Sequence, residues 1–317
     1  MATTATVELD GQYRALREEA GVLDRSERGK LVVRGQDAIE YLQGQLTNDL
    51  EAISPGGGCY SALLDRKGHM RADMRVLLLE EDTVWIDAEA IATAPLRRHL
   101  ETYKVGREVE IDDETDRALV SMIGPAAAAL TGAGPLSPEH AHRELEIGGA
   151  PARAVATDLG IDLIVSRQDA DAVRAALADA GAVEVSEAAA EIVRVESGRP
   201  RFGAEMTDAT IPAEAGIDER AVSFTKGCYI GQETVARLHH RGRPNRHLRG
   251  LRLERPAEPG EPIRLGEREL GSVGTACVSP AHGPIALAIV RREAAPGDRV
   301  SVGDDTSPAE VVGLPFG

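Results

Sequence analysis

From about Arg246 to the end of the chain, the sequence is a series of short β-rich runs with almost no helical pattern. The runs include "HLRGLRLE", "RELGSVGTACVS" and "PIALAIVRRE", and Gly and Pro interrupt them at close intervals. Short, evenly spaced strands of this kind are typical of small barrels and sandwiches. The pattern therefore predicts a C-terminal β-barrel or sandwich at residues 246–317.

The preceding residues mix strand and helix signals. "GQDAIEYLQGQL" places apolar residues at helical spacing, whereas "CYSALLD", "MRADMRVLLLE" and "TVWIDAE" are typical of successive strands. Further along, "GIDLIVS" predicts a strand and "QDADAVRAALADAG" a helix that ends at Gly181. A chain of 317 residues exceeds the size at which one core keeps growing. We therefore expect an α+β protein in three parts, at residues 1–110, 111–245 and 246–317.

The chain is acidic, with a formal net charge of −16. This charge argues against a general nucleic-acid or anionic-membrane partner, because both attract proteins through clustered Lys and Arg. No apolar run approaches a membrane span, and the first residues do not resemble a secretion signal. We expect a soluble, cytoplasmic protein.

One cationic segment interrupts the acidic surface. Residues 237–252, "RLHHRGRPNRHLRGLR", contain six arginines, three histidines and no acid. The segment fits either a binding region for a polyanionic ligand or a solvated loop whose arginines pair with nearby carboxylates.

The three cysteines are far apart and show no CxxC spacing. They indicate neither a disulfide framework nor a metal or four-cysteine cluster site that this chain could complete alone. We expect reduced thiols and no metal site.

The stretch "SFTKGCYIGQET" holds the most reactive candidate, Cys228. A neighbouring lysine can stabilise a thiolate and make it more nucleophilic. Gly227 and Gly231 permit a tight backbone path that would bring four side chains near a ligand, namely Lys226, Cys228, Tyr229 and Gln232. The plainer alternative is that Cys228 fills a small space in a core.

Asp73, in "GHMRADMRV", is the candidate for proton transfer. A carboxylate near the end of a strand could orient or deprotonate an amine. A solvated aspartate at a sheet edge is the simpler interpretation.

Several motifs together resemble a known family. "KGCYIGQE" is very similar to the signature of the YgfZ-type folate-binding proteins, in the superfamily that also holds the aminomethyltransferase (T-protein) of the glycine cleavage system. "YLQGQLTND", "ESGRPRFGAEM", "IPAEAG" and the segments "RHLRGL", "GSVGTACVSP", "PIALAIV" and "VVGLPF" extend the resemblance over nearly the whole chain.

The resemblance implies a three-part cloverleaf of the aminomethyltransferase type around a pocket for tetrahydrofolate, ending in a small β-barrel. It implies that Glu196, in the E-x-G segment, accepts hydrogen bonds from the pterin ring. It also suggests Lys226, Tyr229 and Gln232 as folate contacts, and Arg237 as attracting the glutamate tail.

Two departures from the aminomethyltransferases point to the YgfZ branch. Ala72 and Asp73 stand where those enzymes have an acidic pair, and "KGCYIG" stands where they read K-x-D-F-I-G. That branch is associated with assembly or repair of iron–sulfur clusters, which implies Cys228 as the functional thiol and iron–sulfur carrier or client proteins as partners.

The first hypothesis is therefore a tetrahydrofolate-binding accessory protein of iron–sulfur cluster maturation. The alternative is an enzyme, a folate-dependent aminomethyltransferase or demethylase in which Asp73 moves the proton. A third is a module that only binds folate.

Overall fold

The computed structural model describes residues 4–317, so the first three residues of the predicted first part lie outside it. The chain divides into two compact units. Unit 1 comprises residues 1–63, 71–190 and 221–230, and unit 2 comprises residues 64–70, 191–220 and 231–317. Each unit therefore contains segments that are distant in the sequence.

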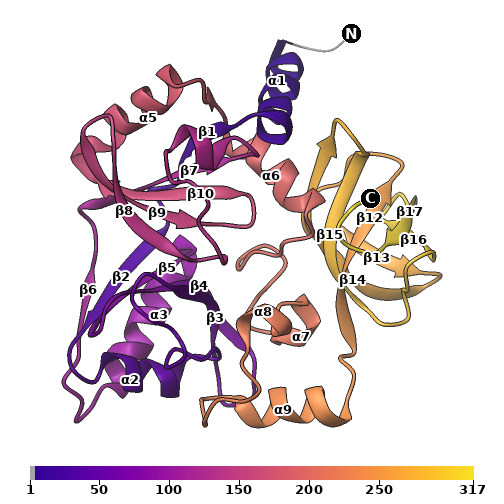
Figure 1. Ribbon diagram of the computed structural model, residues 1–317. Helices are drawn as coiled ribbons and strands as arrows, with labels where there is room; N and C mark the ends of the chain where they lie inside the picture. The colour runs from indigo at the N-terminus through magenta and orange to yellow at the C-terminus, as the bar shows by residue number, and fades with distance from the viewer. Residues whose placement is uncertain (1–3) are drawn as a thin grey trace. The chain divides into compact units, whose positions relative to one another are not determined.

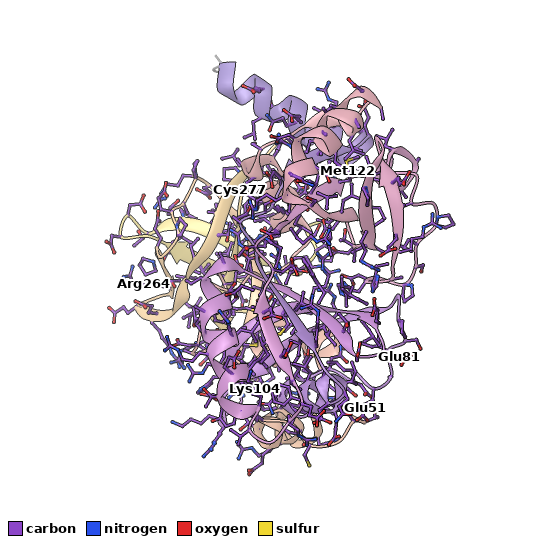
Figure 2. The ribbon with its side chains drawn as sticks, turned by 90° about the vertical axis from the view of Figure 1, so that its left-hand side faces the viewer. Glu51, Glu81, Lys104, Met122, Arg264 and Cys277 are labelled. Carbon is purple, nitrogen blue, oxygen red and sulfur yellow. The ribbon has the colours of Figure 1, made fainter. Side chains whose placement is uncertain are left out.

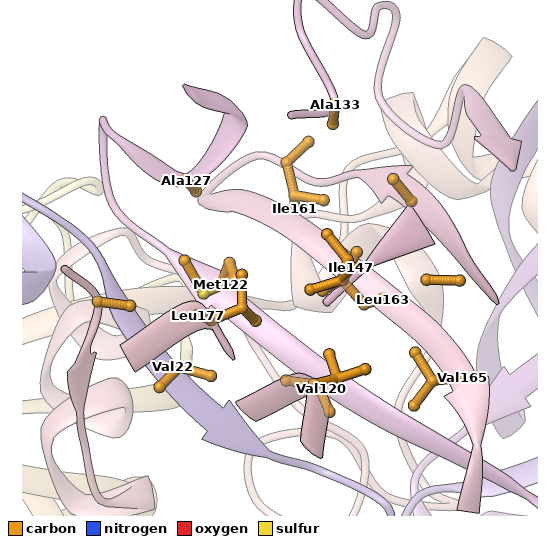
Figure 3. Packing of buried hydrophobic residues seen from close by; sticks show 14 of the residues in the cluster. Val22, Val120, Met122, Ala127, Ala133, Ile147, Ile161, Leu163, Val165 and Leu177 are labelled. Atoms are coloured by element: carbon orange, nitrogen blue, oxygen red, sulfur yellow. The ribbon is translucent and has the colours of Figure 1, made fainter. Parts of the chain in front are cut away.

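Unit 1 contains a six-stranded sheet with the order β11-β1-β7-β10-β9-β8. Its strands are β1 (Gly21–Asp24), β7 (Arg117–Ile123), β8 (His142–Ile147), β9 (Ala150–Ala156), β10 (Gly160–Ser166) and β11 (Val183–Glu184). The even-numbered residues of β7 and the odd-numbered residues of β10 are apolar, and they pack with Leu177 of helix α5 (Ala170–Asp179) (Figure 3). This core buries one face of the sheet. Helices α1 (Thr4–Glu18) and α4 (Ala127–Leu130) also belong to unit 1.

A five-stranded antiparallel sheet, with the order β3-β4-β5-β2-β6, forms the rest of unit 1. Its strands are β2 (Gly29–Arg34), β3 (Gly58–Leu64), β4 (Met70–Glu80), β5 (Thr83–Ala88) and β6 (Glu110–Asp113), accompanied by helices α2 (Ala38–Gln45) and α3 (Ala90–Tyr103) (Figure 1). Leu77 of β4 packs with Trp85 and with Leu119 and Ile164 of the six-stranded sheet. Because side chains alternate along a strand, Asp73 and Arg75 lie on the same face of β4 as Leu77.

Unit 2 contains a closed six-stranded barrel with the order β12-β15-β14-β13-β16-β17. Its strands are β12 (Arg246–Leu253), β13 (Pro262–Leu265), β14 (Arg268–Ser279), β15 (Gly283–Arg291), β16 (Arg299–Val302) and β17 (Ser307–Val312) (Figure 1). Closure removes the sheet edges and encloses a core that includes Leu251, Ile263 and Val290. The predicted C-terminal β-barrel is confirmed, and the sandwich alternative is wrong.

The remaining helices lie between the sheets of unit 1 and the barrel in sequence: α6 (Glu187–Glu196), α7 (Pro212–Ala215), α8 (Asp218–Ala221) and α9 (Gln232–Arg241). No helix within residues 4–317 is both long and apolar enough to cross a membrane. The division at residues 110 and 245 stays a prediction.

Candidate functional site

Asp73 occupies an interior strand rather than a sheet edge, because β4 lies between β3 and β5. Tyr60 of β3 donates its hydroxyl to Asp73 Oδ2 at 2.7 Å. Asp73 Oδ1 is buried and has no hydrogen-bond partner. Burial raises the pKa of Asp73, although the Tyr60 hydroxyl and the charge of Arg28 act in the opposite direction. The interpretation of Asp73 as a solvated edge residue is wrong.

An ion network continues along the same sheet face. Asp87, on β5, is 1% exposed and accepts hydrogen bonds from Arg75 Nε at 2.7 Å and Trp85 Nε1 at 3.2 Å. Arg75 Nη1 reaches Asp162 of the six-stranded sheet at 2.6 Å. Burial opposes ionisation of Asp87, but the neighbouring guanidiniums and N–H donors outweigh it, and the pKa of Asp87 is lowered. Charged side chains therefore join the two sheets beside Asp73.

Lys226 joins two of the motifs in unit 1. Its Nζ donates to the carbonyl oxygens of Gln43, Leu46 and Asn48 at 2.7, 2.8 and 2.7 Å, so the ammonium binds the backbone of "YLQGQLTND". Burial lowers the pKa of Lys226 to about 8, whereas the three acceptors favour its charged form. All three N–H groups of the ammonium already donate to these carbonyl oxygens. Direct folate binding by Lys226 stays a prediction that these contacts do not support.

Cys228 is exposed, so the interpretation that it fills a core space is wrong. Tyr229 is buried, which raises its pKa to about 12, and its ring centroid lies 5.4 Å from Lys226 Nζ. The signature therefore presents its thiol to solvent while its lysine and tyrosine point into the unit.

The two glycines of the signature differ. Gly231 begins α9 with φ at +85°, and a Cβ there would lie 2.5 Å from the carbonyl oxygen of Asp65. Gly227 has no atom within 4 Å of such a Cβ. Only Gly231 is required by the geometry, and it places Gln232 at the first turn of α9.

Glu196 ends α6 and is 4% exposed. Its Oε1 accepts a hydrogen bond from Ser279 Oγ, at the end of β14, at 2.5 Å. The role of Glu196 in binding the pterin ring stays a prediction.

Arg194, two residues before "ESGRPRFGAEM", binds a carboxylate of that motif. Its guanidinium donates to Glu205, whose side chain is fully buried, at 3.0 Å, to Glu191 at 2.8 Å and to Thr275 of the barrel at 2.8 Å. In "IPAEAG", Glu214 accepts from Arg246 at 2.7 and 2.8 Å. Glu205 and Glu214, one from each motif, therefore form ion pairs within unit 2.

The arginines of the cationic segment differ in their surroundings. Arg246 is paired, and Arg252 donates to the carbonyl oxygen of Gly317, as expected for the structural alternative. Arg237 is exposed on α9. The side chain of Arg241 lies outside the described part. Attraction of a folate tail by Arg237 stays a prediction.

The other two thiols are less accessible than Cys228. Burial raises the pKa of Cys59 and of Cys277, which lies on β14 (Figure 2), to about 12 each. Within residues 4–317, no group of three or more His, Cys, Asp or Glu side chains is arranged to hold a metal ion.

Unit 1 also has a hollow of about 510 Å³, whose floor includes Leu79, Trp85 and Ile164. None of the predicted site residues lines it. The hollow therefore gives no support to the predicted site residues, and their assignment stays a prediction.

Sequence reasoning missed Tyr60, Arg28 and Glu89 as neighbours of Asp73. Tyr60 was visible only as an aromatic residue in a predicted strand. Its contact depends on the pairing of β3 with β4, and no spacing in the sequence marks it.

Comparisons with known proteins agree with this architecture. Residues 4–226 match the family model described as GCVT N-terminal domain, and residues 246–316 match the glycine cleavage T-protein C-terminal barrel domain. The aminomethyltransferase of Rubrobacter xylanophilus is 30% identical over 97% of this chain and 86% of its own length. An aminomethyltransferase of Thermus thermophilus is 31% identical over 96% of this chain and 89% of its own length.

A solved structure shows the same fold. The crystal structure of the glycine cleavage system aminomethyltransferase T from Bartonella henselae superposes with a TM-score of 0.88, at 23% identity, over 98% of this chain and 89% of that chain. The mixed α and β units and the closed barrel thus define the class, proteins that combine a GCVT N-terminal domain with a C-terminal barrel. Within that class, the chain belongs to the glycine cleavage T-protein family.

The comparisons confirm the predicted superfamily and fold class. They do not single out the YgfZ branch, because the relatives above carry the name aminomethyltransferase.

Proposed function

We propose that this protein uses tetrahydrofolate to accept a one-carbon unit from an aminomethyl-type donor, with Asp73 moving the proton. The observation that carries the proposal is the Asp73 carboxyl, with Tyr60 on one oxygen and no partner on the other, buried oxygen. A buried acceptor left unpaired costs about 1–3 kcal/mol, and a ligand N–H would satisfy it. The name shared by the relatives, aminomethyltransferase, supports the same reaction class.

Asp73 has the properties of a proton-transfer group. Its raised pKa brings it closer to neutral pH than an ordinary aspartate, which suits both accepting and donating a proton. When bound, tetrahydrofolate supplies two amine nitrogens that form bonds to the transferred carbon. Asp73 Oδ1 would take a proton from an attacking amine and return one to the leaving group. Tyr60 would hold the carboxyl in orientation through Oδ2.

Glu196 is proposed as an acceptor for N–H groups of the folate ring. Its carboxylate is buried in unit 2 and accepts a hydrogen bond from Ser279 Oγ, and a carboxylate is a suitable acceptor for ring N–H groups. Tyr229, Gln232 and Arg237 are proposed as further folate contacts on the resemblance alone. A cytoplasmic location likewise stays a prediction.

A binding titration and a turnover assay test the proposal together. Tetrahydrofolate and its formyl and methylene forms are titrated into the wild type, Asp73→Asn and Glu196→Gln. Turnover is followed as methylenetetrahydrofolate formed from an aminomethylated lipoyl carrier, whose transferred carbon is already at the oxidation level of the product. We expect Asp73→Asn to keep folate affinity within about threefold and to lose about 100-fold or more in kcat. We expect Glu196→Gln to weaken binding by about tenfold or more.

Two results would reject the assignment. Wild-type protein that binds folate but does not turn over the aminomethylated lipoyl carrier is not a transferase of this kind. Turnover by Asp73→Asn at the wild-type rate would remove Asp73 from the mechanism.

A second candidate, an accessory role in iron–sulfur cluster assembly or repair, is favoured by the exposure of Cys228. An exposed thiol can complete a cluster shared with a carrier protein or undergo redox chemistry. Iron–sulfur enzyme activity is measured in a cell that lacks the protein and is supplied with the wild type, Cys228→Ala or Asp73→Asn. If iron–sulfur enzyme activity is lost with Cys228→Ala but not with Asp73→Asn, the accessory role is supported. If it is lost with Asp73→Asn but not with Cys228→Ala, the transferase is supported. Full activity with Cys228→Ala shows that the thiol has no part in the function.

A further inference from the structure

Asp73 of β4, Glu89 directly after β5 and Arg28 directly before β2 continue one row across three neighbouring strands. Met74 of β4 pairs with Ala88 of β5, and Ala88 pairs with Gly29 of β2. The next position along each strand segment is Asp73, Glu89 and Arg28. Glu89 therefore stands between the other two, and Arg28 Nη1 forms an ion pair with it.

Arg28 is already shared between two carboxylates. Besides Glu89, its Nε donates to Asp87 Oδ1 at 3.1 Å. Arg75, the second guanidinium, donates to Asp87 and to Asp162. An ionised Asp73 would be a fourth carboxylate beside two guanidiniums, so its negative charge would be uncompensated in a partly buried place.

We propose that Glu89 is a positioning residue that acts through Arg28 to keep the proton on Asp73. Glu89 engages the cation that would otherwise stabilise the Asp73 carboxylate, and it repels that carboxylate directly. Asp73 consequently keeps its proton to a higher pH than an ordinary aspartate, and in the proposed reaction the proton that it takes from the attacking amine is held for the leaving group. Only this use of the proton rests on the proposed function.

Other charged and titratable groups also face Asp73 or its row. Tyr60 approaches from β3 and favours the ionised form by donating a hydrogen bond. Arg75 lies two positions along β4, with Asp87 on β5 and Asp162 on β10 as its partners. Burial raises the pKa of Asp73 and Glu89 raises it further, whereas Tyr60 and Arg28 lower it. These opposite effects of Glu89 and Arg28 on the pKa of Asp73 agree with the position of both residues in its row.

Titration of the Asp73 carboxyl tests the inference without any folate. The protein is labelled with ¹³C at the aspartate side-chain carboxyl, and the Asp73 resonance is assigned by its absence in Asp73→Asn. We expect Glu89→Gln to lower the midpoint of this resonance by about one pH unit or more, because a repulsive charge is lost and Arg28 is released. Glu89→Asp, which keeps the charge, should stay close to the wild type. Exposed Glu81→Gln is the matched control and should not change it (Figure 2).

An unchanged or raised midpoint in Glu89→Gln overturns the inference. Glu89 is also the N-cap residue of α3. If Glu89→Gln does not fold, Glu89→Ser repeats the measurement, because serine is a favourable N-cap without charge. A lowered midpoint in a protein without transferase activity supports the inference and rejects the proposed function. In an active protein, Glu89→Gln should shift the pH dependence of kcat in the same direction as the resonance.

Discussion

At the scale of single residues, burial distinguishes the three thiols. Cys228 is exposed, whereas burial raises the pKa of Cys59 and Cys277 to about 12. With a pKa of about 12, both half-buried thiols are almost fully protonated at pH 8, and only the thiolate form is the nucleophile. We expect iodoacetamide to alkylate Cys228 at least about 100-fold faster than either, as measured by mass spectrometry of peptides over time. Cys228→Ala should leave only the slow phases, and equal rates for all three thiols would contradict the described burial.

The titration of Asp73 affects stability as well as chemistry. Its pKa is raised in the folded protein, so its contribution is fully present below the ordinary aspartate pKa and is lost as the pH rises through the raised value. Asparagine cannot ionise and can still accept from Tyr60. We expect Asp73→Asn to be more stable than the wild type at pH 7.5 by about 1 kcal/mol, with the difference shrinking toward pH 4. Thermal unfolding at both pH values checks this, and a less stable variant at pH 7.5 would mean that the carboxylate is favoured in the fold.

At the scale of elements, the start of α9 depends on one glycine. Gly231 has φ at +85°, and an added Cβ would lie 2.5 Å from the carbonyl oxygen of Asp65. We expect Gly231→Ala to lower the free energy of unfolding by about 2–4 kcal/mol, since it adds both backbone strain and a clash with a backbone atom. Urea unfolding measures the difference. Gly227→Ala, with no atom near the added Cβ, is the control and should cost less than about 1 kcal/mol.

The elements themselves were largely predictable, because strand and helix patterns depend on nearby residues. The strands at "MRADMRVLLLE" and "GIDLIVS" and the helix ended by Gly181 formed as expected. The contacts that define the site were not predictable, because they join distant segments. The Lys226 ammonium donates to carbonyl oxygens at the end of α2, about 180 residues earlier, and a sequence does not show which backbone carbonyls will accept such bonds.

The motif residues show a related limit. Glu205 lies in a segment that carried the family resemblance, and Arg194 lies just before that segment. The two side chains form a structural ion pair. Resemblance alone could not separate such residues from Glu196, which belongs to the same segment, is buried and accepts a hydrogen bond from Ser279. The contacts of each side chain in the structure, rather than its residue type, show which of these charged residues form structural ion pairs.

At the scale of the whole molecule, net charge should influence stability. At pH 7 the formal charge is −16, so long-range repulsion among carboxylates opposes the folded state. Ion pairs such as Arg255 with Asp305, at 2.7 Å, act in the opposite direction. Salt screens distant charges more completely than groups in contact, because the Debye length falls from about 30 Å at 10 mM to about 8 Å at 150 mM.

Repulsion should therefore be the larger salt-sensitive contribution. We expect the Tm at pH 7.5 to rise by about 2–5 °C when NaCl is raised from 10 to 150 mM, as followed by circular dichroism. Near pH 5, close to the isoelectric point of about 5.0, the net charge vanishes and the rise should disappear. A Tm that falls with salt at pH 7.5 would show that the ion pairs outweigh the repulsion, because screening would then remove more attraction than repulsion.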